Sequence, residues 1–537
     1  MFQEMKLQTA LAIALVTVMS FVAGCGGGKD DVMELPCSGT SCSPSIPPNP
    51  VTPSDPPPPV TKLCPDAHDY SIIYTGGSGS GEYVKVRFDT AALTYQMQFI
   101  LSSIPTSAGQ LNTTRAGKTI SGSFHHPSTL PTPEQNRCAF VLENGTSTDN
   151  SYSVTINPAD PPMLFTGLGV VSGGIPGASI QLDGVALLGN LGAVPARTFD
   201  SFPFIGFTET EADFTKVAGN YNELGLHLSP TGTSYQTTRP QGWQPDVIHR
   251  NQTLNSDGSC TITSGSDYSC RSTGTPWTLR VNTDGSPDKV FVSKPTSSGS
   301  PYPSAGQGQP IVLLTPSEAQ GIMIVGKLRG ALIPIVIRVG HTFLPASSSD
   351  LLNTVVDSEF GMSVLAPAAT LVANSIKGNF IGATSASMCG VVDSAGNSGA
   401  PAVGDASFNA SQPHPNLPGV YSGTFFQPTA GNCLDNTAVS TPAANYTATL
   451  FEGTTAGFVN PQTSTAMGMF ELDYTQLTAG VIGATAQRDF NASNSSGPIA
   501  IVRSGDTGWI VKVGEVYAMV MNPNKFNPFF AIGAFVE

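Results

Sequence analysis

Residues 82–88 read Glu-Tyr-Val-Lys-Val-Arg-Phe, and this stretch decides the fold class. Val84, Val86 and Phe88 alternate with more polar residues at positions 83, 85 and 87. Strict alternation places the apolar side chains on one face of a β-strand and the other set on the opposite face. Residues 93–100 continue the pattern, and the chain beyond residue 64 consists of similar short runs separated by Gly, Asn, Asp and Pro. The sequence therefore predicts an all-β fold of antiparallel strands.

Two Asp-Gly turns support antiparallel hairpins. Residues 282–285, Asn-Thr-Asp-Gly, separate the β-type runs 277–281 and 289–294, and residues 255–258, Asn-Ser-Asp-Gly, repeat this turn chemistry. Such turns between apolar runs are typical of hairpins. The apolar stretch 321–339 is broken by glycine, proline and two charged residues, so we expect two buried strands joined by a turn.

A loose recurrence divides the body of the chain. Triplets with glycine first and an aromatic residue third begin β-type runs at positions 219, 378 and 419. We interpret this as three tandem β modules, 64–205, 206–350 and 375–537, each a sandwich or a small open barrel. The alternative is that Gly and Pro simply recur in any β-rich chain. Residues 351–374 are expected to be an inter-module linker, and 364–377 is the one stretch that predicts a helix, weakened by Pro367.

The N-terminus has the pattern of an export signal. Lys6 precedes an apolar run, Leu7–Val22, which is short for a membrane-spanning helix, and small residues follow it. Val22-Ala23-Gly24-Cys25 resembles the lipobox of bacterial lipoproteins. This resemblance implies that residues 1–24 are a lipoprotein signal peptide and that Cys25 is acylated and becomes the new N-terminus.

The same resemblance implies a location. Several acyl chains on one cysteine anchor a protein stably, whereas a single chain binds a membrane only marginally. Gly26 rather than Asp follows Cys25, which in this family implies an outer-membrane destination. Residues 25–63 would form a lipid-anchored linker, in which nine of the sixteen positions from Pro44 to Pro59 are proline. Such a tract favours polyproline II and predicts either a spacer or a connector of no defined length.

Eight cysteines remain after Cys25, an even number that indicates disulfides in an exported protein. Proximity along the chain favours four pairs, although eight cysteines allow other connectivities. The four pairs are Cys37–Cys42, Cys64–Cys138, Cys260–Cys270 and Cys389–Cys433. A zinc site is disfavoured because the sequence contains no C-x-x-C pair. We expect no metal and no cofactor.

Charge excludes one class of partner. The formal net charge is −14 and only 12% of residues are charged, without a basic run that could follow a phosphate backbone. Nucleic acid is therefore not an expected partner. The membrane is the expected partner through the N-terminal lipid, and a carbohydrate or protein ligand stays open.

Motifs for catalysis are missing from the sequence. H-E-x-x-H and G-x-S-x-G do not occur, and acids such as Asp288 and Glu318 cannot be paired from sequence alone for glycoside hydrolysis. Trp243, Trp277 and Tyr268 lie among amide and hydroxyl residues, a composition that suits stacking on sugar rings, with core packing as the alternative.

These patterns favour a non-catalytic binding or interaction role for a lipid-anchored protein of the cell envelope. They leave enzymatic activity open. The alternative is an envelope-anchored hydrolase acting on polysaccharide or peptide, and a third class is a purely structural envelope protein.

Overall fold

Antiparallel β-strands account for nearly all of the regular structure in the computed structural model. The structure describes residues 62–107, 113–158, 161–182, 194–231, 242–262, 277–293, 296–305, 312–340, 342–345, 354–357, 360–384, 413–414, 417–421, 431–432, 447–460, 465–494, 497–502, 504–521 and 529–535. The predicted all-β class is thereby confirmed. Within these ranges no helix has the length and apolar character needed to span a bilayer.

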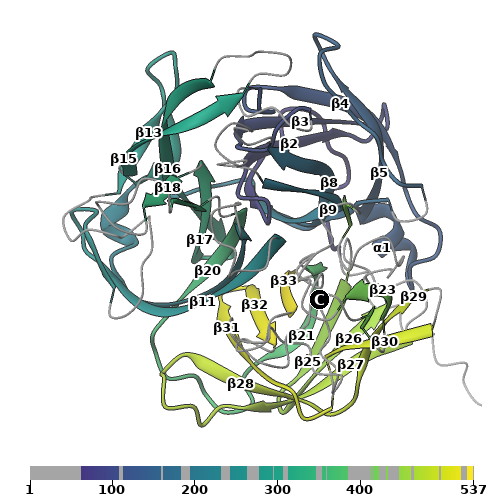
Figure 1. Ribbon diagram of the computed structural model, residues 1–537. Helices are drawn as coiled ribbons and strands as arrows, with labels where there is room; N and C mark the ends of the chain where they lie inside the picture. Colours follow the sequence, from purple (N-terminus) through teal and green to yellow (C-terminus); the bar gives the residue numbers. More distant parts are fainter. Residues whose placement is uncertain are drawn as a thin grey trace, which may run out of the picture. The chain divides into compact units, whose positions relative to one another are not determined.

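The first eight-stranded sheet closes into a barrel, here called the N-barrel, because β1 pairs with both β2 and β9. Around the barrel the strands are β1 (Tyr74–Ser78), β2 (Tyr83–Asp89), β3 (Thr94–Leu101), β4 (Thr119–His125), β5 (Ala139–Ser147), β7 (Met163–Thr166), β8 (Val170–Leu182) and β9 (Val194–Phe207), with β6 (Ser153–Val154) beside β5 and β24 (Gly431–Asn432) parallel to β9. Figure 1 shows them in purple to blue, apart from β24. The structure thus closes a module for which the sequence suggested a sandwich or an open barrel.

The alternation in residues 82–88 separates the two faces of β2. Val84, Val86 and Phe88 are fully buried in the apolar interior of the N-barrel. Lys85 is only partly buried, as expected for the outer face, but Tyr83 is fully buried on that same face. Tyr83 is buried because the outer face packs against the next sheet, where it joins a different cluster of apolar side chains.

The second sheet is open and is here called the central sheet. Its strands, in spatial order, are β12 (Cys260–Ile262), β11 (Gly242–Leu254), β10 (Gly219–Thr231), β20 (Phe360–Pro367), β17 (Ala331–Gly340), β16 (Val312–Leu328), β14 (Pro287–Val292) and β13 (Thr278–Val281), with β15 (Thr296–Ala305) beside β16. The predicted hairpins are confirmed: turns 255–258 and 282–285 connect β11 to β12 and β13 to β14, and the stretch 321–339 folds as β16 and β17.

The third sheet is a second closed eight-stranded barrel, the C-barrel, drawn in green to yellow in Figure 1. Its strands are β21 (Lys377–Thr384), β25 (Thr447–Glu452), β26 (Thr455–Asn460), β27 (Thr465–Asp473), β28 (Val481–Ala486), β31 (Thr507–Val513), β32 (Val516–Met521) and β33 (Phe529–Phe535). Three two-stranded sheets complete the strands: β18 (Thr342–Pro345) with β19 (Thr354–Asp357), β22 (Pro413–His414) with β23 (Leu417–Tyr421), and β29 (Phe490–Asn494) with β30 (Gly497–Val502).

One apolar cluster joins the three sheets. It contains Phe207 of the N-barrel, Ile324 and Ile335 of the central sheet, and Val516 and Val520 of the C-barrel. The whole of β32 is buried, because alternate side chains fill the C-barrel interior and this shared cluster. A strand buried on both faces reads as a continuous apolar run rather than as an alternation.

Part of the predicted inter-module linker is a strand. Residues 360–367 form β20, which pairs with β10 on one side and β17 on the other. The predicted helix over 364–377 is therefore wrong: its first four residues lie in β20, and β21 begins at Lys377. Because β20 is central and buried on both faces, it lacks the alternation that identifies half-buried strands.

The region around Cys138 carries the α-helix α1 (Pro133–Cys138), which the sequence analysis missed. The Thr132 side chain caps it by accepting a hydrogen bond from the Gln135 backbone N–H, and the Gln135 side chain accepts one from the Thr132 backbone N–H. Cys138, at the end of α1, forms a disulfide with Cys64, as predicted.

The short 3-10 helix η2 (Phe214–Lys216) lies between the N-barrel and the central sheet in sequence.

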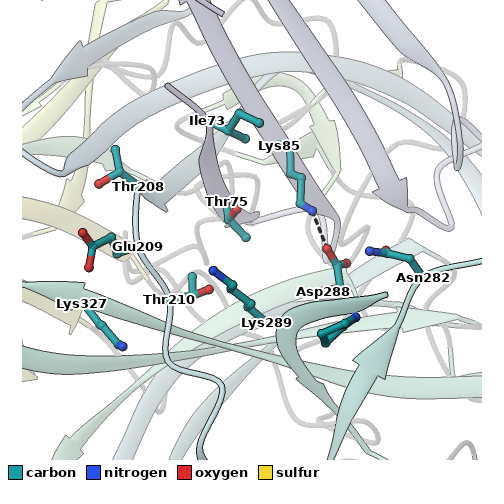
Figure 2. A pocket seen from close by; sticks show the side chains of 11 residues that line it. Ile73, Thr75, Lys85, Thr208, Glu209, Thr210, Asn282, Asp288, Lys289 and Lys327 are labelled. Carbon is teal, nitrogen blue, oxygen red and sulfur yellow. Dashed lines mark hydrogen bonds and ion pairs between the residues drawn. The ribbon is translucent and has the colours of Figure 1, made fainter. Parts of the chain in front are cut away.

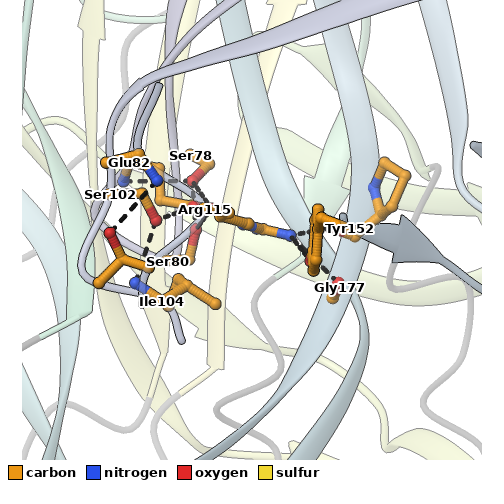
Figure 3. Close-up of polar contacts among 11 residues, drawn as sticks. Ser78, Ser80, Glu82, Ser102, Ile104, Arg115, Tyr152 and Gly177 are labelled. Atoms are coloured by element: carbon orange, nitrogen blue, oxygen red, sulfur yellow. Dashed lines mark hydrogen bonds and ion pairs between the residues drawn. The ribbon is translucent and has the colours of Figure 1, made fainter. Parts of the chain in front are cut away.

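An ion pair is enclosed at the N-barrel (Figure 3). Glu82 and Arg115 are both fully buried, with Arg115 Nε donating to Glu82 Oε1 at 2.5 Å and a second nitrogen bonded to the other carboxylate oxygen. Ser80 and Ser102 donate hydroxyl hydrogen bonds to Glu82, each at 2.5 Å. Arg115 also donates to the Tyr152 hydroxyl. This network ties the β1–β2 turn to the connection between β3 and β4.

His68 makes stability dependent on pH. Burial, and next the positive charge of Arg137, lower the pKa of His68 from 6.5 to about 4. Below pH 6.5 the unfolded chain therefore binds a proton that the folded protein excludes until about pH 4, so stability falls across that interval. The expected loss for this residue is about 3 kcal/mol.

Urea unfolding measured across the same pH interval checks this prediction. His68→Phe should flatten the pH dependence, since phenylalanine can pack on Phe88 and Phe140, which His68 contacts edge-on. The matched control is His125→Phe at an exposed histidine. An unchanged pH profile in His68→Phe would contradict the assignment.

Candidate functional site

A polar pocket of about 530 Å³ lies between the N-barrel and the central sheet (Figure 2). It is here called the lysine pocket because three lysines line it. Its lining residues are Ile73, Thr75, Lys85, Thr208, Glu209, Thr210, Asn282, Pro287, Asp288, Lys289 and Lys327. Asp288, named in the sequence analysis as a candidate acid, is thus in a pocket. The sequence analysis did not identify the three lysines, which come from three different strands.

The segment that follows β9 forms one wall of the pocket. Thr208 donates its backbone N–H to the Gly169 carbonyl of the N-barrel. Residues 209–211 then run along β16, with Lys327 N donating to the Glu209 carbonyl and Glu211 N to the Val325 carbonyl. These main-chain bonds hold the Glu209 backbone to β16.

Asp288 is engaged in ion pairs. Its side chain is 1% exposed, and one carboxylate oxygen accepts from Lys85 Nζ while the other accepts from an Arg280 nitrogen at 2.5 Å. Both cations also lie 5.7 Å from the centre of the Tyr83 ring. Burial, followed by the charge of Asp288, raises the pKa of Tyr83, so the phenol stays neutral. Asp288 therefore joins the N-barrel to the central sheet.

Lys327 at the pocket wall is also paired. Its Nζ lies 3.1 Å from Glu211, which Lys216 also approaches at 3.4 Å. Burial favours the neutral acid, but the backbone N–H groups of Asp213 and Ala212 and the Lys327 charge outweigh it and lower the pKa of Glu211 to about 2. Glu211 is therefore ionised and holds Lys327 in place.

Most of the predicted site residues lie elsewhere. Trp277 is 3% exposed and packs in the core of the central sheet, so its indole ring offers no free face for stacking. Trp243 belongs to β11, and Tyr268 lies outside the described residues. Cys260 is disulfide-bonded. The remaining predicted cysteines also lie outside the described residues: Cys25, Cys37, Cys42, Cys270, Cys389 and Cys433.

Comparison with known proteins identifies the family. The sequence profile of DUF2957, described as a protein of unknown function, matches residues 94–534. The chain belongs to the DUF2957 family. No curated protein sequence matches this DUF2957 chain.

Two solved structures align with this DUF2957 protein, both mutants of the vaccine antigen transferrin binding protein B from Haemophilus parasuis Hp5. The double mutant aligns over 88% of this chain and 66% of its own, with 8% identity and a TM-score of 0.19. The single mutant aligns over 87% and 66%, with 7% identity and a TM-score of 0.20. The DUF2957 chain thus spans just under two thirds of the length of these structures.

Proposed function

We propose that this DUF2957 protein is a lipid-anchored protein of the outer membrane that binds a small polar ligand in the lysine pocket without transforming it. The observation that carries the proposal is the pocket itself. Its volume of about 530 Å³ accommodates a small molecule, and charged, hydroxyl and amide side chains line it from both the N-barrel and the central sheet. The N-terminal sequence supports the anchor at Cys25.

The arrangement of the acids favours binding over hydrolysis. Glycoside hydrolysis needs two carboxylates, of which one supplies a proton and the other acts as a base or nucleophile. The lysine pocket contains two, Glu209 and Asp288. Asp288, however, accepts from Lys85 and Arg280 at the same time, so cations of the protein engage both of its carboxylate oxygens. Neither oxygen of Asp288 is therefore left free to act on a substrate as the second carboxylate of a hydrolytic pair.

The anchor makes a direct prediction. Cys25→Ser removes the thiol that would be acylated, so the protein should move from the membrane fraction to the water-soluble fraction of the cell envelope. Fractionation followed by immunoblotting measures this, with Ser38→Ala as the control that changes a linker residue outside the lipobox. Retention of Cys25→Ser in the membrane fraction would refute lipid anchoring.

The binding role is tested by incubating the purified protein with a library of small polar metabolites and analysing the complex by native mass spectrometry. We expect a ligand that is recovered chemically unchanged. Thr208→Trp, at an exposed lining position, should fill the pocket and abolish binding. Release of a cleaved product would support the hydrolase alternative, and equal binding by Thr208→Trp would place the ligand elsewhere.

A further inference from the structure

Lys289 has an unusual backbone conformation. Its φ is +54°, in the left-handed region that residues with a Cβ atom rarely adopt. It lies in an irregular part of the β13–β14 pair, where β13 advances two positions from Leu279 to Val281 while β14 advances four from Pro287 to Phe291. The extra residues form a bulge that contains Lys289.

The bulge changes where two neighbouring side chains point. In a regular strand, consecutive side chains lie on opposite faces of the sheet. Asp288 and Lys289 are consecutive, yet both line the lysine pocket. Asp288 is buried against Lys85 and Arg280, whereas Lys289 is exposed and its ammonium group points into the pocket in Figure 2. The bulge thus supplies a structural anion and an accessible cation from adjacent positions.

Lys289 is the lysine of the pocket whose ammonium group has no ion-pair partner among the described residues. Asp288 pairs with Lys85, and Glu211 pairs with Lys327. The Lys289 side chain makes no hydrogen bond or ion pair with the described part of the chain. Left-handed conformations at residues other than glycine cost free energy and concentrate at functional sites. The strained backbone and the unpaired charge that it presents to the pocket are together suited to ligand binding.

We propose that Lys289 binds an anionic group of the ligand, a carboxylate or a phosphate, in the lysine pocket. This inference rests on the proposed binding function. The hydroxyls of Thr75 and Thr210 and the amide of Asn282 line the same space and can donate further hydrogen bonds to anionic oxygens. Glu209 lines it as well and opposes highly charged anions, so the ligand carries one anionic group.

The test compares three probes by calorimetry and by the shift in thermal unfolding midpoint: glycerol 3-phosphate, lactate and glucose. The wild-type protein should bind an anionic probe, and the phosphate and carboxylate arms show which oxyanion is preferred. Lys289→Ala should weaken this binding about tenfold to a hundredfold, since a hydrogen bond to a charged group is lost. Lys289→Arg should retain binding. Lys377→Ala removes another exposed strand lysine outside the pocket and should have no effect.

Lys289→Gly separates the charge from the backbone strain. Glycine adopts positive φ without a Cβ penalty, so this variant should melt at a higher temperature than the wild type while losing affinity for the anionic probe. A lower melting temperature would show that the conformation of Lys289 is not strained and would remove that support.

The outcomes distinguish this inference from the binding proposal. Equal anion binding by wild type and Lys289→Ala overturns the role of Lys289. Binding of glucose alone, lost in Thr208→Trp but kept in Lys289→Ala, overturns the anion inference and leaves the pocket as a binding site. Failure of both anionic probes to bind the wild type also overturns the inference.

Discussion

Arg115→Met is expected to lower the free energy of unfolding by about 3–5 kcal/mol, because it leaves the buried carboxylate of Glu82 without its cation. Both side chains are 0% exposed, and two nitrogens of the guanidinium group bond the two oxygens of the carboxylate. Arg115 also lies 4.2 Å from the centre of the Phe99 ring, so its loss removes a cation–π contact as well. Urea unfolding followed by circular dichroism measures the change.

A double-mutant cycle isolates the ion pair from packing. Glu82→Gln together with Arg115→Met removes both charges, so the double variant should be more stable than Arg115→Met alone. Arg87→Met is the matched control, since Arg87 is a partly exposed arginine of the same barrel. Stability of Arg115→Met close to that of the wild type would contradict a structural role for this pair.

Removing the Cys64–Cys138 disulfide is expected to cost about 4 kcal/mol in the chain-entropy description. The bond joins residues 74 positions apart, and it links the segment before β1 to the end of α1. The closed loop contains the first four strands of the N-barrel, so the unfolded chain gains much freedom when the bond is absent. The measurement is the thermal unfolding midpoint of the Cys64→Ser, Cys138→Ser double variant.

Two comparisons make that measurement specific. Cys64→Ala, Cys138→Ala tests whether the hydroxyl groups of serine, rather than the lost bond, cause the change at these buried positions. Cys260→Ser removes a different disulfide-bonded cysteine, in the central sheet, and its effect should be additive with that of the double variant. A double variant with the same thermal unfolding midpoint as the wild type would show that the disulfide does not stabilise the N-barrel.

Local pattern was sufficient for the strand class and for the turns. The alternation of Val84, Val86 and Phe88 identified β2 and its inner face. The Asn-x-Asp-Gly sequences placed two hairpin turns, because Gly258 and Gly285 adopt positive φ and an aspartate caps each turn. These features depend on residues only a few positions apart, so a single sequence contains them.

Closure and burial by other sheets could not be predicted. β1 closes the N-barrel by pairing Thr75 with Phe207, and no local pattern indicates a contact at that sequence separation. β20 resembled a helix or a linker because both of its faces are buried: Met362 and Val364 lie in the cluster shared by the three sheets, and Leu365 lies in the core of the central sheet. Tyr83, on the outer face of β2, is buried because the same shared cluster covers it.

The lysine pocket could not be assembled from sequence for two physical reasons. Lys289 and Lys327 belong to β14 and β16, which pair within the central sheet, and Lys85 joins them only when the N-barrel contacts that sheet. The bulge at Lys289 is an irregularity in backbone pairing. A positive φ is usually indicated by a glycine in the sequence, and this position is a lysine instead. Asp288 was named from its residue type alone, and its role as an ion-pair partner follows only from the contacts with Lys85 and Arg280.

A crystal structure of the protein soaked with tungstate, a phosphate-like anion with a strong anomalous signal, tests the central claim most directly. Crystals should be grown without phosphate or sulfate. The account predicts an anomalous peak in the lysine pocket within hydrogen-bond distance of Lys289 Nζ, and no such peak in Lys289→Ala. Tungstate bound elsewhere while the wild-type pocket holds only water would contradict the claim that this pocket is the ligand site for an anion.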